Sequence, residues 1–153
     1  IEQSDDIVVL TIRWLGVPAD TQTIQVSNNS DEYPKVLAAL YEFCHEYHIP
    51  NETRGSLQLI LEESVINVMN YAYPKGVEGL IEVLFKANSE WFSITLIDSG
   101  KAFNPLQKDT NLKVERRRGK GGMGILIFKE LTDKIDYNYT NECNRLEMWV
   151  RVN

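Results

Sequence analysis

The first candidate site for binding or reacting with a phosphate group consists of Glu63, Asn67 and Asn70. Glu63 and Asn67 are four residues apart, so on a helix their side chains are neighbours on one face. An asparagine oxygen is a hard, neutral ligand for Mg²⁺, and a glutamate one turn away is placed to accept a proton from a hydroxyl or a water. An exposed polar stripe on an amphipathic helix would give the same pattern.

A second group follows a short apolar strand and begins with Asp98, Ser99 and Gly100. A carboxylate at a strand end can accept a hydrogen bond from the exocyclic amine of adenine. Because Gly100 has no side chain, a base could approach its backbone closely. The same residues also occur in plain turns after strands, so this motif is weak when it is taken alone.

The third group is a glycine cluster that opens an apolar helix. Its candidate nucleotide-binding residues are Lys120, Gly121, Gly122, Met123 and Gly124. Bare backbone N–H groups and the positive end of the helix dipole together favour phosphate. The alternative is a flexible linker. The spacing is neither the Walker A pattern nor a dinucleotide fingerprint.

The pattern of apolar residues predicts the helices and strands that carry these three groups. Helices are expected over residues 36–47, 51–72 and 123–131. Strands are expected over residues 7–14, 23–27, 80–86, 92–97, 135–139 and 146–152. Ser30 and Asp31 are expected to cap the first helix, and Asn51 or Thr53 the second. Because the strands come mostly as hairpins, the order predicts an α+β two-layer sandwich, with a mostly antiparallel sheet and helices on one face.

The bulk composition describes an ordinary acidic globular domain. The chain has 153 residues, a net charge of −6 and 43% hydrophobic residues. An acidic surface repels phosphate backbones, so nucleic acid is not an expected partner, and a bound nucleotide needs a metal ion or backbone N–H groups. The two cysteines show no metal-binding spacing, and no run is long enough for a membrane span. These features predict a cytoplasmic domain.

The three ordered motifs together resemble the GHKL (Bergerat-fold) ATPases, and most closely the anti-sigma-factor serine kinases. Residues 63–67 with 71–73 are similar to the N box of that family, residues 98–105 to its G1 box, and residues 121–125 to its G2 box. Residues 133–148 also follow the closing strands of the family. Many GHKL enzymes have a threonine before the last strand, and here Asn144 and Arg145 stand nearby instead.

The resemblance implies ATP or ADP and Mg²⁺ as cofactors. Glu63 would be the general base, Asn67 the Mg²⁺ ligand and Asp98 the adenine reader, with Gly100 and Phe103 beside the nucleotide. The residues up to Gly124 would form the lid and the phosphate cradle. The family substrate is a serine or threonine hydroxyl of a small anti-anti-sigma (STAS-domain) partner. The kinase also binds a sigma factor or a similar regulator, often as a homodimer.

Two other functions remain open at this stage. The domain could bind nucleotide and sequester a partner without turnover, or it could be a histidine-kinase catalytic domain. Histidine kinases carry asparagine where this chain has Glu63, and they need a phosphoacceptor histidine. The two histidines here, His45 and His48, fit surface or packing positions better.

The first residues stand apart from the kinase resemblance. Residues 2–10 resemble the closing strand of bacterial type 2C, sporulation-class phosphatases, in which a residue matching Asp5 binds metal. We therefore expect residues 1–14 to be the remnant of an upstream phosphatase domain and residues 15–153 to be the ATP-binding domain. An ordinary edge strand is the alternative. The arginines at 116–118 are expected to be a solvated segment.

Overall fold

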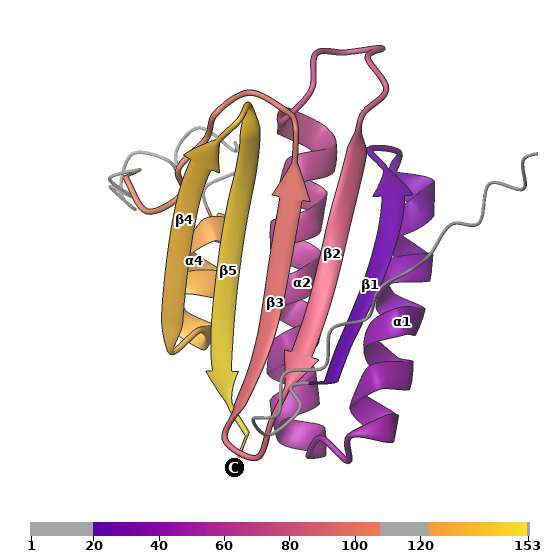
Figure 1. Cartoon of the computed structure of the whole chain (residues 1–153), viewed down its shortest axis with the longest axis vertical. Coiled ribbons are helices and arrows are strands. Elements are labelled where there is room, and N and C mark those ends of the chain that lie inside the picture. Colours follow the sequence, from indigo (N-terminus) through magenta and orange to yellow (C-terminus); the bar gives the residue numbers. More distant parts are fainter. Residues whose placement is uncertain (1–19, 108–122, 153) are drawn as a thin grey trace, which may run out of the picture.

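The computed structural model describes residues 20–107 and 123–152, which form one sheet with helices on one face (Figure 1). The strands are β1 (Asp20–Ser27), β2 (Leu80–Ala87), β3 (Trp91–Asp98), β4 (Lys134–Thr140) and β5 (Cys143–Arg151). The helices are α1 (Tyr33–Glu46), α2 (Asn51–Tyr71) and α4 (Met123–Leu131), with a short 3-10 turn at Ser30–Glu32. The predicted α+β two-layer sandwich is confirmed.

The sheet order is β1-β2-β3-β5-β4, and all four pairings between the described strands are antiparallel. The last strand therefore does not lie at an edge, because β5 inserts between β3 and β4 (Figure 1). This order sets Asp98 at the end of β3 directly opposite Asn144 at the start of β5. A tight hairpin turn at Asn141 and Glu142, both with positive φ, fixes the register of β4 against β5.

The core lies between the sheet and the three helices. Alternate residues of β2 and β3 point to this layer and are fully buried, as the period of two along a strand requires. Phe43 of α1 packs against Phe85 of β2 and Phe92 of β3, with ring centroids 6.0 and 5.5 Å away. This aromatic cluster anchors α1 to the centre of the sheet, and α2 then packs beside α1.

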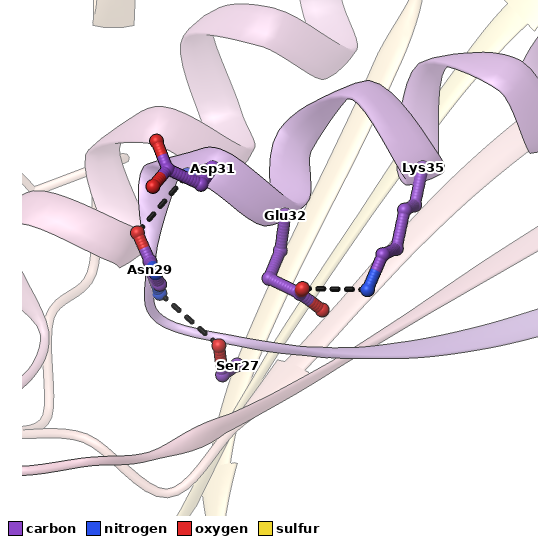
Figure 2. A network of polar contacts seen from close by, with 5 residues as sticks. All are labelled: Ser27, Asn29, Asp31, Glu32 and Lys35. Carbon is purple, nitrogen blue, oxygen red and sulfur yellow. Dashed lines mark hydrogen bonds and ion pairs between the residues drawn. The ribbon is translucent and has the colours of Figure 1, made fainter.

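The entry into α1 is held by short-range polar contacts (Figure 2). Asn29 accepts a hydrogen bond from the backbone N–H of Asp31 at 3.0 Å, and the Ser27 hydroxyl accepts one from the Asn29 N–H at 3.4 Å. Lys35 forms an ion pair with Glu32 at 2.6 Å. Asn29 therefore caps the 3-10 turn that precedes α1, one residue before the predicted Ser30 and Asp31. Glu32 is the N-cap of α1 itself and makes no side-chain cap hydrogen bond.

The start of α2 also differs from the prediction. Pro50 occupies the N-cap position, with φ −58° and ψ 148°, and its carbonyl accepts the first helical hydrogen bond from the Arg54 N–H at 2.9 Å. Asn51 and Thr53 lie inside the helix rather than capping it, and Thr53 is buried. The extended conformation that proline favours ends the preceding turn and lets the helix begin at once.

Some predicted elements lie outside the described residues. The strand at 7–14, the proposed domain remnant at 1–14 and residues 108–122, including the arginines at 116–118, are among them. The described part of the long predicted loop, residues 99–107, contains turns and no helix or strand. No helix in the described parts of the chain is long and apolar enough to cross a membrane.

Candidate nucleotide-binding site

One cavity of about 440 Å³ lies between α2, α4 and the ends of the strands nearest to them. Its walls come from α2, from β3 and the residues after it, from α4, and from β4 and β5. The lining residues are Ser64, Asn67, Val68, Tyr71, Ala72, Leu96, Asp98, Lys101, Phe103, Pro105, Ile125, Phe128, Tyr137, Asn144 and Leu146. Mostly apolar walls with a few polar groups are typical of small-molecule sites.

Asp98 is the buried carboxylate of this cavity. It ends β3 and is only 5% exposed. Its Oδ1 accepts hydrogen bonds from the Gly100 N–H at 2.8 Å and from Asn144 Nδ2 at 3.0 Å. Burial raises the pKa of Asp98 above its ordinary value, although both hydrogen bonds act in the opposite direction. The chain therefore holds an acceptor in a fixed orientation in the cavity wall.

Close packing against α2 requires a glycine at position 100, whether or not a base approaches its backbone. A Cβ at this position would lie 2.6 Å from both Cβ and the carbonyl oxygen of Ala72 at the end of α2. The Lys101 N–H also donates to the Ala72 carbonyl at 2.9 Å. The chain after β3 crosses directly over the end of α2, and any side chain at position 100 would point into α2. Only glycine fits there without displacing α2.

The polar residues of α2 divide between the cavity and its surroundings. Asn67 lines the cavity and is partly buried. Asn70 is exposed and is not one of the lining residues. Tyr71, four residues after Asn67, lines the cavity instead. On a helix, a residue four positions along lies closer to the same face than a residue three positions along, which is where Asn70 stands. The structure therefore does not bring Asn70 to the site.

Glu63 lies beside the start of α4 rather than in the cavity wall. A Cβ built on Gly124, the second residue of α4, would overlap the Glu63 carboxylate. The carboxylate thus rests against the helix entrance that the glycine cluster was predicted to form. Of that cluster, Lys120, Gly121 and Gly122 fall outside the described residues, and Met123 is the first residue of α4.

Phe103 is another predicted nucleotide contact, and it lines the cavity while remaining 40% exposed. Its backbone N–H donates to Asn144 Oδ1 at 3.1 Å and to the Tyr137 hydroxyl at 3.2 Å. The segment after β3 is therefore fastened to both β4 and β5, and this holds Phe103 at the cavity rim.

Sequence reasoning missed two polar residues that organise the Asp98 region. Asn144 is 5% exposed and bonds to Asp98, to the segment after it and to Tyr137. Tyr73 donates its hydroxyl to the Leu80 carbonyl at 2.8 Å and accepts the Ser99 N–H at 3.0 Å. The only sequence signal for Asn144 was its place near the threonine of related enzymes. Its contact with Asp98 depends on strand register.

The donor set at the α2 end of the cavity is compatible with Mg²⁺. Among the described residues, no cluster of three or more His, Cys, Asp or Glu side chains could hold a metal by itself. Mg²⁺ in nucleotide sites takes one or two protein ligands, and phosphate oxygens and waters complete its shell. A lining asparagine oxygen such as that of Asn67 meets this requirement.

Comparison with known proteins agrees with this geometry. No curated protein sequence is similar enough to count as a match. A solved structure, described as the crystal structure of the RsbU and RsbW domains of Rv1364c from Mycobacterium tuberculosis, superimposes with a TM-score of 0.61 at 13% identity. The match covers 88% of this chain and 33% of that one. The superposition shows that the two proteins share a fold over the matched region. The family model of the histidine kinase-like ATPase domain matches residues 26–150. The chain therefore belongs to the histidine kinase-like ATPase domain family, and this membership implies ATP binding.

Proposed function

We propose that this domain is a Mg²⁺-ATP-dependent protein serine/threonine kinase of the anti-sigma-factor type. The observation that carries the proposal is that Asn67 and Asp98, from α2 and from the end of β3, line the same cavity. Had they lain on opposite sides of the molecule, one nucleotide could not have contacted both. The family match to residues 26–150 supports the nucleotide part of the proposal.

The Asp98 side of the cavity suits an adenine ring. Leu96, Ile125 and Phe128 provide apolar walls for the faces of the base. The Asp98 carboxylate accepts a hydrogen bond from the exocyclic amine, and its fixed orientation lowers the entropy lost on binding. A buried acceptor of this kind also rejects a base that presents a carbonyl at the same place.

Glu63 is the proposed general base for the hydroxyl of the protein substrate. Its carboxylate rests against Gly124 at the entrance of α4, where backbone N–H groups favour phosphate. Asn67 lies one helical turn further along the same face of α2 and would hold Mg²⁺, which neutralises phosphate charge when it is bound. The base and the metal ligand are thus spaced to act on the same phosphate.

The proposed partner is a STAS-domain anti-anti-sigma protein, which donates the serine or threonine hydroxyl. A sigma factor or a similar regulator is the proposed second partner, held by the same domain. A homodimer and fusion to an upstream phosphatase domain also stay predictions from the sequence. The rival hypotheses are a nucleotide-dependent binding module without turnover and a histidine-kinase catalytic domain.

A Glu63→Gln variant tests the proposal. With Mg²⁺-ATP and a purified STAS-domain protein, we expect this change to slow phosphotransfer about 10²- to 10⁴-fold, because a general base is lost. ADP affinity should stay within about threefold, because the carboxylate does not line the cavity. Glu62→Gln is the matched control, since Glu62 is the exposed neighbour on α2. It should transfer phosphate at the wild-type rate.

The outcomes separate the three functions. Phosphotransfer that is unaffected by Glu63→Gln would reject Glu63 as the base. A wild-type protein that binds a partner in response to ADP or ATP, with no phosphorylation of it, would favour the binding module. Transfer to a histidine of another chain would favour the histidine-kinase hypothesis.

A further inference from the structure

Asn144 is the most densely hydrogen-bonded side chain at the cavity, although no catalytic or ligand-binding motif includes it. It is 5% exposed and lies opposite Asp98 in the β3–β5 register. Its Nδ2 donates to Asp98 Oδ1 at 3.0 Å, to the Lys101 carbonyl at 3.1 Å and to the Gly100 carbonyl at 3.3 Å. Its Oδ1 accepts from the Tyr137 hydroxyl at 2.6 Å and from the Phe103 N–H at 3.1 Å.

The chemistry of these partners determines which way the amide faces. A carboxylate and backbone carbonyls can only accept, so they must meet the NH₂ group. A backbone N–H can only donate, so it must meet the oxygen. Aspartate at 144 would keep the acceptor but lose both donor hydrogens, and leucine would lose both functions. The site therefore uses the two-sided character of an asparagine amide.

We infer that Asn144 is a positioning residue for nucleotide recognition, which orients the Asp98 carboxylate and fastens residues 100–103 along the cavity rim. The inference rests on the proposed adenine-binding function and deepens it. Asn144 acts through Asp98 Oδ1, which it shares as an acceptor with the Gly100 N–H. A carboxylate held by two donors cannot rotate away from a base without breaking both hydrogen bonds.

The β4–β5 hairpin supplies the support for this arrangement. Its two-residue turn at Asn141 and Glu142 has positive φ values, typical of a tight hairpin that fixes register. The register places Tyr137 of β4 opposite Leu146, close enough to Asn144 for its hydroxyl to reach the amide oxygen. The last two strands thus position Asn144 beside Asp98, in addition to lining the cavity with Tyr137 and Leu146.

The test compares two ligands, ADP and inosine diphosphate (IDP). Inosine carries a carbonyl where adenine carries the exocyclic amine. The ratio of the two dissociation constants therefore reports whether the Asp98 carboxylate is oriented to accept a hydrogen bond from that amine. In wild type we expect ADP to bind at least about tenfold more tightly than IDP, since a site built to accept a hydrogen bond rejects a ligand that cannot donate one. Calorimetric titration in Mg²⁺ buffer gives both constants.

Asn144→Asp and Asn144→Leu should each reduce this preference for ADP about tenfold, to near equality, because Asp98 loses its amide donor. Val26→Ala is the matched control. Val26 is a buried core residue of β1, at the far edge of the sheet, so its truncation lowers stability without touching the cavity. This variant should keep the wild-type ratio of the two dissociation constants. The comparison therefore separates the orientation of the Asp98 carboxylate from a general loss of stability.

Tyr137→Phe provides the test if the two Asn144 variants do not fold. It removes only the hydroxyl that donates to Asn144 Oδ1, from a partly exposed edge strand, and should lower the ratio about threefold. Wild-type ratios in the folded Asn144 variants, or in Tyr137→Phe if those do not fold, would overturn the inference. A wild-type protein that binds no ADP, or that does not prefer it, would instead reject the proposed adenine site.

Discussion

The two ends of the cavity are built in different ways. At the end formed by Asp98 and Asn144, both side chains are 5% exposed and are joined to each other and to the following segment by hydrogen bonds. At the end formed by Glu63, Asn67 and Gly124, all three residues are partly buried. No hydrogen bond between described residues orients the side chains of Glu63 or Asn67.

This difference indicates a division of labour between the sheet and the helices. The sheet holds the Asp98 carboxylate rigidly, whereas Glu63 and Asn67 of α2 have no orienting hydrogen bond within the described residues and can move to meet a phosphate. Changes at the Asp98 end should therefore alter affinity and stability together. Changes at the Glu63 end should alter the rate of transfer and leave the fold intact. The two glycines that touch these ends provide a direct comparison.

Gly100→Ala should have the largest effect. The new methyl group would lie 2.6 Å from the Ala72 carbonyl oxygen, which is backbone and cannot rotate aside. We expect the free energy of unfolding to fall by about 1–3 kcal/mol, as overpacking typically costs. ADP affinity should fall with it, because α2 and the end of β3 both line the cavity. Urea denaturation and calorimetry measure the two effects.

Gly55→Ala is the control for that change. An added Cβ on Gly55, an exposed residue of α2, meets no atom within 4 Å. Alanine is the better helix former, so stability should stay equal or rise by up to about 1 kcal/mol. Equal behaviour of the two variants would contradict the crossing of α2 by the segment after β3.

Gly124→Ala should have a smaller effect, and of another kind. The methyl group would displace the Glu63 carboxylate, which is the free end of a flexible side chain and can rotate away. Because alanine replaces glycine within a helix, the fold should lose no stability. Phosphotransfer to a STAS-domain protein should slow about tenfold as the base is misplaced, with ADP affinity nearly unchanged. A loss of ADP affinity without a change in rate would reverse the assignment of the two ends.

The pH dependence of stability should show the smallest effect. Since burial raises the pKa of Asp98 above its ordinary 3.8, the native state retains a proton that the unfolded state has already lost. The contribution of Asp98 to stability therefore falls as the pH rises from 3.8 through the raised pKa, and is constant above it. Asp98→Asn lacks this titration, while an amide oxygen can still accept from Gly100 and Asn144.

The checking measurement is urea denaturation of wild type and Asp98→Asn at pH values from about 4 to 8. The variant should gain stability relative to wild type as the pH rises through that window, since all other carboxyl groups are common to both proteins. A stability difference between the two proteins that stays constant across the whole pH range would show that burial does not raise the pKa of Asp98.

The local elements could be predicted from the sequence because they depend on short-range patterns. The period-two strands and the amphipathic helix faces place most element ends within a few residues of those observed. The helix starts were less accurate. Asn29 and Pro50 act there through turn geometry that a list of capping residue types does not contain. The sheet order, with β5 inserted next to β3, depends on long-range pairing that the pattern does not encode.

The candidate site, like the fold, could be predicted in part from the sequence. The sequence placed Asn67 and Asp98 in one site, and both line the cavity. Asn70 was included because it lies one turn further along α2, although three residues rotate the side chain off the face that four would keep. Asn144 was not assigned a role because its contacts with Asp98 and Phe103 exist only after three strands have paired in one register.

Calorimetric titration of ADP with Mg²⁺ into wild type and Asp98→Asn measures whether Asp98 binds the adenine base in this cavity. We expect one nucleotide bound per wild-type chain and an affinity at least about tenfold lower in the variant, because the proposed acceptor for the adenine amine is changed. The variant should still fold, as thermal unfolding would show. Equal affinity of the two proteins for ADP would rule out Asp98 as the residue that binds the adenine amine.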